Sequence, residues 1–204
     1  MEINLLRHGE SVGNASGIIQ GQINVDLTEE GYKQASLAAE RLKNENFDYI
    51  ISSDLRRAKN TAREVIKFHS DMELILDSRL RERDHGEYDG MLKSRVDKDL
   101  IKRNKEDTHF AFPGGESSYD LLKRVKEFHD EIFSDDKYKD KKILIVAHST
   151  VIKTFLALLN QKDEVKAMEE ISLWEVSNTA LYKIDAKNPT SPEFLVKNCV
   201  SHLE

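Results

Sequence analysis

Two histidines in this chain stand directly after apolar runs that are typical of buried strands. His8 follows residues 3–6 with Arg7 between them, and His148 follows the run Lys-Ile-Leu-Ile-Val-Ala at residues 142–147. Ligands of open sheets bind at the carboxyl ends of parallel strands, so we expect both imidazoles at one sheet edge. A neutral imidazole is a nucleophile, and an adjacent guanidinium both clamps anions and disfavours a charged ring. The pattern predicts chemistry on a phosphoryl group.

The elements that position these residues alternate between apolar strands and amphipathic helices. This alternation predicts an α/β fold, a three-layer α/β/α sandwich with a mainly parallel central sheet and late strands that add an antiparallel edge. A length of 204 residues without a Pro/Gly-rich linker indicates a single domain over residues 1–204. Expected strands cover residues 3–6, 47–51, 73–76, 142–147, 172–176, 180–184 and 193–196, and expected helices cover residues 28–42, 54–68, 91–105, 117–133 and 151–159.

Composition and charge exclude several classes of partner. The chain has 31 basic and 37 acidic residues, a net charge of −6, which argues against nucleic acid or a membrane surface as a partner. No apolar run is long enough to span a membrane, and no signal peptide is evident. Cys199 is the single cysteine, so no intrachain disulfide can form, and we expect a cytoplasmic protein.

The segment Leu-Arg-His-Gly-Glu-Ser at residues 6–11 resembles the signature of the histidine phosphatase superfamily, whose members are phosphoglycerate mutase-like in fold. Further segments resemble that family in the same order. They are Ser-Ser-Asp-Leu-Arg-Arg-Ala at residues 52–58, Leu-Arg-Glu at residues 80–82, Pro-Gly-Gly-Glu-Ser at residues 113–117 and Ala-His at residues 147–148. The resemblance extends from residue 3 to about residue 184 and points to the broad-specificity phosphatase branch.

The resemblance implies a role for each member of the site. His8 is the nucleophile that forms a phosphohistidine intermediate, and Glu82 protonates the leaving oxygen and then activates water. The phosphoryl oxygens are bound by four side chains. Three of them, cationic or hydrogen-bond donors, offset the charge on those oxygens, so we expect neither a metal nor another cofactor. The four binding residues are Arg7, Arg57, His148 and Asn14.

Residues 91–112 are expected to act as a lid or specificity insertion over the pocket. In the family that this sequence resembles, the insertion after the acid segment covers the site. We therefore expect it to contact the leaving group of a small phosphate ester. The candidate contacts are Lys93, Arg95, His109, Phe110 and Phe112.

One position departs from the family pattern that the sequence resembles. Ser149 and Thr150 follow His148, where glycine is usual. A backbone with positive φ at that position would be costly for serine. We nevertheless expect His148 to function, because the preceding strand and the following helix are intact.

Three alternatives stay open at this point. A cofactor-dependent phosphoglycerate mutase would use the same His8 chemistry, although the short excursion between Gly90 and Pro113 favours a phosphatase. A binding module without turnover would be expected to lack the nucleophile or the acid. A metal site is disfavoured because neighbouring arginines repel a dication; its ligands would be His8, His148, His85 and Glu82.

The chain is expected to be a monomer or a homodimer.

Overall fold

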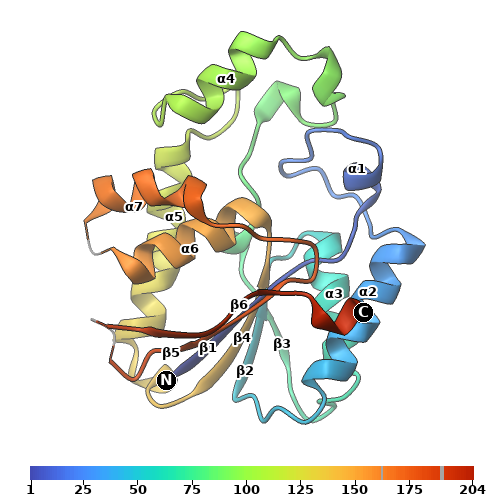
Figure 1. Ribbon diagram of the computed structural model, residues 1–204, viewed down its shortest axis with the longest axis vertical. Helices are drawn as coiled ribbons and strands as arrows, with labels where there is room; N and C mark the ends of the chain where they lie inside the picture. Colours follow the sequence, from blue (N-terminus) through green and yellow to red (C-terminus); the bar gives the residue numbers. More distant parts are fainter. Residues whose placement is uncertain (162, 189–190) are drawn as a thin grey trace.

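The computed structural model describes residues 1–161, 163–188 and 191–204, and it is built around one six-stranded sheet (Figure 1). The strand order is β3-β2-β4-β1-β5-β6. β1, β4, β2 and β3 run parallel, and β5 and β6 add an antiparallel edge beside β1, as predicted. The strands are β1 (Glu2–Arg7), β2 (Tyr49–Ser52), β3 (Leu74–Leu76), β4 (Lys142–Ala147), β5 (Leu181–Asp185) and β6 (Glu193–Cys199).

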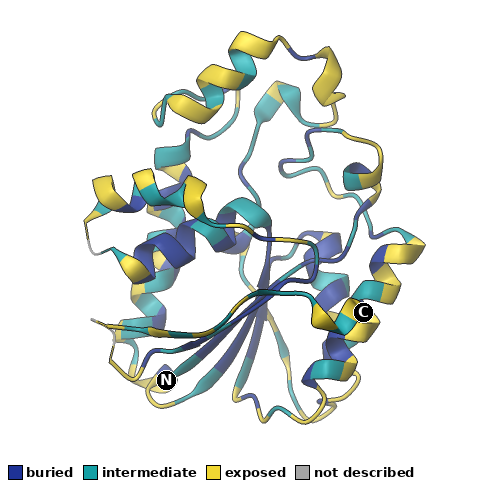
Figure 2. Cartoon of the chain, viewed as in Figure 1, coloured by how far each residue is buried: buried dark blue, intermediate teal, exposed yellow. Residues whose placement is uncertain are grey.

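Helices cover both faces of this sheet, which confirms the three-layer sandwich. Alternate side chains of the parallel strands point to opposite faces. Leu6, Ile50 and Val146 pack with α2 (Glu29–Leu42) and α3 (Arg56–Ile66). Leu5, Ile51 and Ile145 pack on the other face with α5 (Ser118–Ser134), α6 (Ser149–Asn160) and α7 (Glu164–Glu170). The central strands β1, β2 and β4 are buried on both faces, which explains the unbroken apolar runs of their sequences (Figure 2).

Side-chain caps fix where three of the helices begin. The Thr28 hydroxyl accepts a hydrogen bond from the backbone N–H of Gly31 and starts α2 where the sequence predicted. Ser117 and Asp120 form a reciprocal capping box at the start of α5. A second capping box, between Ser11 and Asn14, opens the short α1 (Val12–Ala15) directly after the His8 turn.

Two predicted elements differ from the structure. Residues 172–176 are not a strand, because the edge of β5 is already paired with β6. The carbonyl of Val176 instead accepts a hydrogen bond from Arg7. The single helix expected over residues 91–105 is split into a 3-10 turn (Lys93–Arg95) and α4 (Lys98–Glu106), because Asp97 caps a new helix start.

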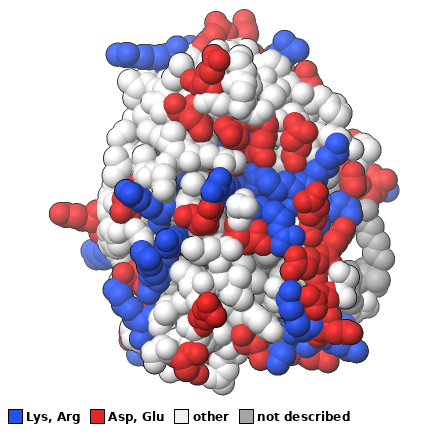
Figure 3. Space-filling view, turned by 180° about the vertical axis from the view of Figure 1, so that it is seen from behind, with Lys and Arg blue, Asp and Glu red and all other residues white. Residues whose placement is uncertain are grey.

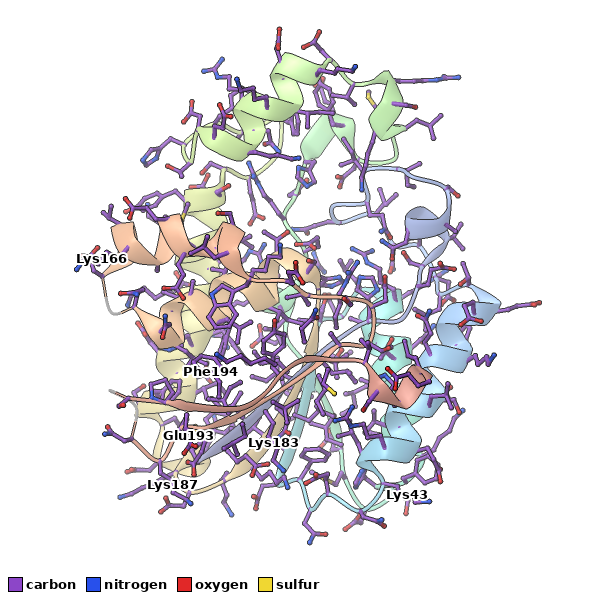
Figure 4. All side chains as sticks on the ribbon, viewed as in Figure 1. Lys43, Lys166, Lys183, Lys187, Glu193 and Phe194 are labelled. Atoms are coloured by element: carbon purple, nitrogen blue, oxygen red, sulfur yellow. The ribbon has the colours of Figure 1, made fainter. Side chains whose placement is uncertain are left out.

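The two ends of the sheet have different surroundings. α4 lies beyond the carboxyl ends of the parallel strands, at the top of Figure 1. The labelled side chains Lys183, Glu193 and Phe194 of the antiparallel edge lie away from it (Figure 4). Phe194 packs there against Trp174, with ring centroids 5.2 Å apart. Among the described residues, no helix is both long enough and apolar enough to cross a membrane.

Candidate active site

The ends of β1, β4 and β2 bring the two histidines together as the sequence predicted. The backbone N–H of His8 donates to the carbonyl of Ala147 (3.1 Å), and that of Ser53 donates to the carbonyl of Val146 (3.0 Å). These bonds extend the parallel ladder by one residue past each strand. The rings of His8 and His148 lie with centroids 5.1 Å apart, and both residues are buried. Sheet register, more than loop conformation, therefore sets their separation.

The imidazole of His8 is held in one tautomer. Its Nδ1 lies 2.7 Å from the carbonyl oxygen of Gly9, and a carbonyl can only accept, so Nδ1 carries the proton. The lone pair is then on Nε2. Burial, with the charges of Arg7 and Arg57, lowers the pKa of His8 well below its ordinary value. His8 is therefore a neutral, oriented base or nucleophile.

His148 presents a hydrogen-bond donor to the site, whereas His8 presents a lone pair. Its Nε2 lies 2.9 Å from the hydroxyl of Ser53, which itself accepts a hydrogen bond from the N–H of Leu55. The Ser53 hydroxyl can therefore donate to Nε2, which leaves the proton on Nδ1. Burial, with the charge of Arg57, lowers the pKa of His148 as well. Its Nδ1 is buried and has no hydrogen-bond partner among the described residues, so it is a donor free for a ligand.

Two arginines, Arg57 buried and Arg7 half-buried, complete this end of the site. Arg7 donates to the carbonyl of Val176 (2.7 Å), and Arg57 donates to the carbonyls of Gly21 (2.7 Å) and Ile23 (2.9 Å). These neutral acceptors orient each guanidinium without neutralising it. Burial lowers the pKa of Arg57 to about 10, and the group stays charged at neutral pH. Within the described residues the Nε atoms of both arginines are buried without a partner.

Glu82 is placed by the segment after β3 and by the start of α6. One carboxylate oxygen accepts from the backbone N–H of Thr150 (3.3 Å), and the other accepts from the N–H of Arg83 (2.9 Å). These two bonds fix the orientation of the Glu82 carboxyl group at the cavity wall. Among the described residues, Glu82 is also the only acidic side chain on the cavity that contains His8.

A cavity of about 410 Å³ joins the sheet edge to the lid. This volume lies in the range of small-molecule sites. Figure 3 shows the face of the molecule that is hidden in Figure 1. Lys and Arg side chains gather across the middle of this face, although the net charge of the chain is −6. The cavity is lined by Arg7, His8, Asn14, Ile18, Ile19, Gln20, Gly21, Arg57, Glu82, His85, Lys93, Ile101, Asn104, Lys105, Phe112, Ser149 and Thr150.

Residues 3–198 match the profile of the histidine phosphatase superfamily (branch 1). The chain belongs to this family. It is 34% identical over 163 residues to phosphoserine phosphatase 1 of Hydrogenobacter thermophilus, covering 78% of this chain and 76% of the relative. It is 37% identical over 166 residues to the metal-independent phosphoserine phosphatase of Arabidopsis thaliana, covering 78% and 69%. A solved mycobacterial glucosyl-3-phosphoglycerate phosphatase matches with a TM-score of 0.83 and 28% identity, covering 97% of this chain and 99% of the other.

The structure brings together most of the predicted histidine phosphatase site. Arg7, His8, Asn14, Arg57 and Glu82 line one cavity, and His148 lies directly behind His8. The carboxamide oxygen of Asn14 is occupied by the capping box with Ser11. Only the rest of that side chain is left for a phosphoryl group.

The predicted lid contacts divide into two groups. Lys93 and Phe112 line the site cavity. Arg95, His109 and Phe110 do not, which corrects that part of the prediction. His109 packs on Tyr119 over a separate cavity, and Phe110 lies under the guanidinium of Arg103.

Sequence reasoning missed the residue that attaches the lid. Arg83 is buried next to Glu82, and its guanidinium donates to the side-chain oxygen of Asn104 (2.8 Å) and to the carbonyl of Phe110 (3.0 Å). It also donates to the hydroxyl of Ser118 (2.8 Å) and to the carbonyl of Glu116 (2.9 Å). An arginine in an acidic, polar loop gives no signal of burial, so only the structure identifies this role.

Two other sequence questions have structural answers. Ser149 is the first residue of α6 and is absent from the non-glycine residues with positive φ, which among the described residues are Asp140, Thr179 and Asn198. Serine is therefore unstrained there. Within the described part of the chain, no group of three or more His, Cys, Asp or Glu side chains is arranged to hold a metal ion. His8, His148, His85 and Glu82 form no such group either.

Proposed function

We propose that this protein is a metal-independent phosphomonoesterase that hydrolyses small organic phosphates through a phosphohistidine at His8. One observation carries the proposal. Three buried nitrogen atoms, Nε of Arg7, Nε of Arg57 and Nδ1 of His148, lack partners among the described residues beside a neutral, oriented imidazole. Unpaired buried donors are costly unless a ligand satisfies them. A phosphoryl group with several acceptor oxygens fits this requirement.

In the first step, the Nε2 lone pair of His8 attacks phosphorus and a P–N bond forms. The P–O bond to the leaving group breaks, and Glu82 gives its proton to the leaving oxygen. Arg7, Arg57 and His148 stabilise the charge on the non-bridging oxygens.

In the second step, water attacks the phosphorus while Glu82 accepts a proton from it. The P–N bond breaks, the electron pair returns to Nε2 of His8, and inorganic phosphate leaves. The site is then as it was before the first step, so the two steps together consume one ester and one water.

The relatives support this assignment, because two of them are named as phosphoserine phosphatases and one of those as metal-independent. We further propose that residues 1–204 form one domain with residues 91–112 as its lid. A free thiol at Cys199 fits action in a reducing cytoplasm.

The proposal is tested by phosphate release from p-nitrophenyl phosphate and a panel of metabolite phosphates with EDTA present, beside an assay for 3-phosphoglycerate isomerisation. We expect release that EDTA leaves unchanged and that His8→Ala abolishes. Isomerisation without net release would replace the proposal by a mutase. A folded protein inactive in both assays would point to a binding module.

A further inference from the structure

Beyond the phosphoryl-binding end, the cavity carries more positive charge than a phosphoryl group requires. Arg7 and Arg57 face the phosphoryl position at the sheet edge. The lid adds two ammonium groups, Lys93 from the 3-10 turn and Lys105 from α4. Glu82 is the one carboxylate on the wall, and our mechanism assigns it to proton transfer. The lid end of the cavity is therefore cationic without a counter-charge of its own.

The two lysines also differ from their neighbours on the lid. Lys102 pairs with Glu106 (4.0 Å) and Arg103 pairs with Asp107 (3.6 Å) along α4. Among the described residues, neither Lys93 nor Lys105 lies within ion-pair distance of a carboxylate. Two exposed cations of α4 are thus paired with carboxylates, whereas the two lysines that line the cavity are left for a ligand.

We infer that the preferred substrates are phosphate monoesters whose leaving group carries a second anion, bound by Lys93 and Lys105. This inference rests on the proposed phosphatase function and adds the chemical class of its substrate. Ammonium groups at the mouth of a cavity attract and orient an anion more than they anchor it, because solvent screens them. Charge at this end therefore discriminates between esters that the phosphoryl end binds equally.

The carbon part of the leaving group also has a place. Ile101 and Phe112 line the lid end, and Ile18 and Ile19 line the side of the cavity. These four side chains make part of the cavity wall apolar. The cavity of about 410 Å³ accommodates a short carbon skeleton with a charged group at its far end.

The sharpest test compares two esters that differ in one group. 3-Phosphoglycerate has a carboxylate where glycerol 3-phosphate has a hydroxymethyl group. We expect kcat/KM to be about tenfold higher for 3-phosphoglycerate, and the ratio to fall as salt is raised. Fructose 1,6-bisphosphate against fructose 6-phosphate distinguishes a second phosphate from a carboxylate as the preferred anion. Preference for the ester with the second anion in either pair supports the inference, and equal kcat/KM values in both pairs overturn it.

Two variants connect the preference to the lysines. Lys93→Met combined with Lys105→Met should bring the ratio close to one while turnover of p-nitrophenyl phosphate stays within about twofold of the parent. Lys98→Met, an exposed control at the start of α4, should leave the ratio unchanged. A double variant that keeps the full preference overturns the inference. Absence of phosphate release from every ester, p-nitrophenyl phosphate included, instead contradicts the proposed function itself.

Discussion

The sheet edge and the lid are the two halves of one cavity, and they are built in opposite ways. His8, Arg57 and His148 are buried, with 3%, 1% and 0% of their surface exposed. The register of β1 and β4 places the two histidines side by side, and Arg57 lies in the first turn of α3. Lys93 and Lys105 are exposed on short segments outside the sheet, and the lid shows mainly exposed and intermediate residues (Figure 2). Rigid packing thus holds the groups assigned to bond making, while the groups assigned to substrate choice stay near solvent.

This difference predicts which substrates a substitution in each half should affect. A change at the sheet edge should affect every substrate, because every substrate presents a phosphoryl group there. A change in the lid should affect substrates according to their leaving groups. Arg83 is the connection between the halves, because it lies next to Glu82 in sequence and donates to Asn104 and Phe110 of the lid segment. The following predictions test this division, from the largest expected effect to the smallest.

Replacing the buried guanidinium should remove most activity. In Arg57→Met the phosphoryl oxygens lose a cation, so we expect kcat/KM to fall about 1,000-fold for all esters alike. Steady-state kinetics on p-nitrophenyl phosphate and on an alkyl ester measure this. Arg56→Met, the exposed neighbour, is the control and should stay near the parent. A loss confined to one ester would break the division between the halves.

Removing the proposed acid should separate leaving groups. Glu82→Gln cannot protonate an alkoxide, so turnover of glycerol 3-phosphate should fall about 100-fold. The rate of the nitrophenolate burst from p-nitrophenyl phosphate, which reports the first step alone, should fall far less, because nitrophenolate leaves without a proton. Glu87→Gln, exposed in the same segment, serves as the control. Equal losses on the two esters would argue against Glu82 as the acid.

Detaching the lid should cost binding more than chemistry. Asn104→Ala removes one partner of Arg83, and we expect KM for 3-phosphoglycerate to rise about threefold with kcat on p-nitrophenyl phosphate unchanged. Arg83→Met leaves several buried acceptors unpaired and should lower the free energy of unfolding by about 3 kcal/mol. Urea denaturation of the two single variants and of the double variant that combines them gives the coupling free energy between Asn104 and Arg83. Additive losses would show that the two residues do not act as a unit.

The buried histidines should make stability depend on pH. Folding lowers the pKa of His8 and His148, so below the ordinary value of 6.5 the unfolded chain binds protons that the folded chain excludes. Their contribution is present above pH 6.5 and is lost as the pH falls, by about 1.4 kcal/mol per pH unit for each group. Denaturation at several pH values should show a smaller slope for His8→Leu combined with His148→Leu. Identical slopes would contradict the burial argument.

The catalytic half was predictable from the sequence because local signals fix it. The run at residues 142–147 can only be a buried strand, and a polar residue directly after such a strand must emerge at the sheet edge. His8 and His148 were placed at this edge for this reason. Arg57 follows no strand directly and was identified by the family resemblance alone.

The lid half was not predictable in the same way. Residues 91–105 carry a helical charge pattern, yet Asp97 begins a new helix, and Phe110 packs under Arg103 of that helix. Lys105 and Asn104 line the site because Arg83 fixes the end of α4, a tertiary contact without a local signal. Exposed segments are specified by such long-range contacts, which spacing along the chain does not reveal.

The central claim is that His8 carries the phosphoryl group between ester and water. The direct measurement is rapid mixing with p-nitrophenyl phosphate, quenching in alkali to preserve phosphohistidine, and peptide mass spectrometry. We predict a burst of nitrophenolate close to one per protein chain and a phosphoryl adduct on His8, with neither in His8→Ala. An adduct on another side chain, or undiminished turnover by His8→Ala, would contradict the account.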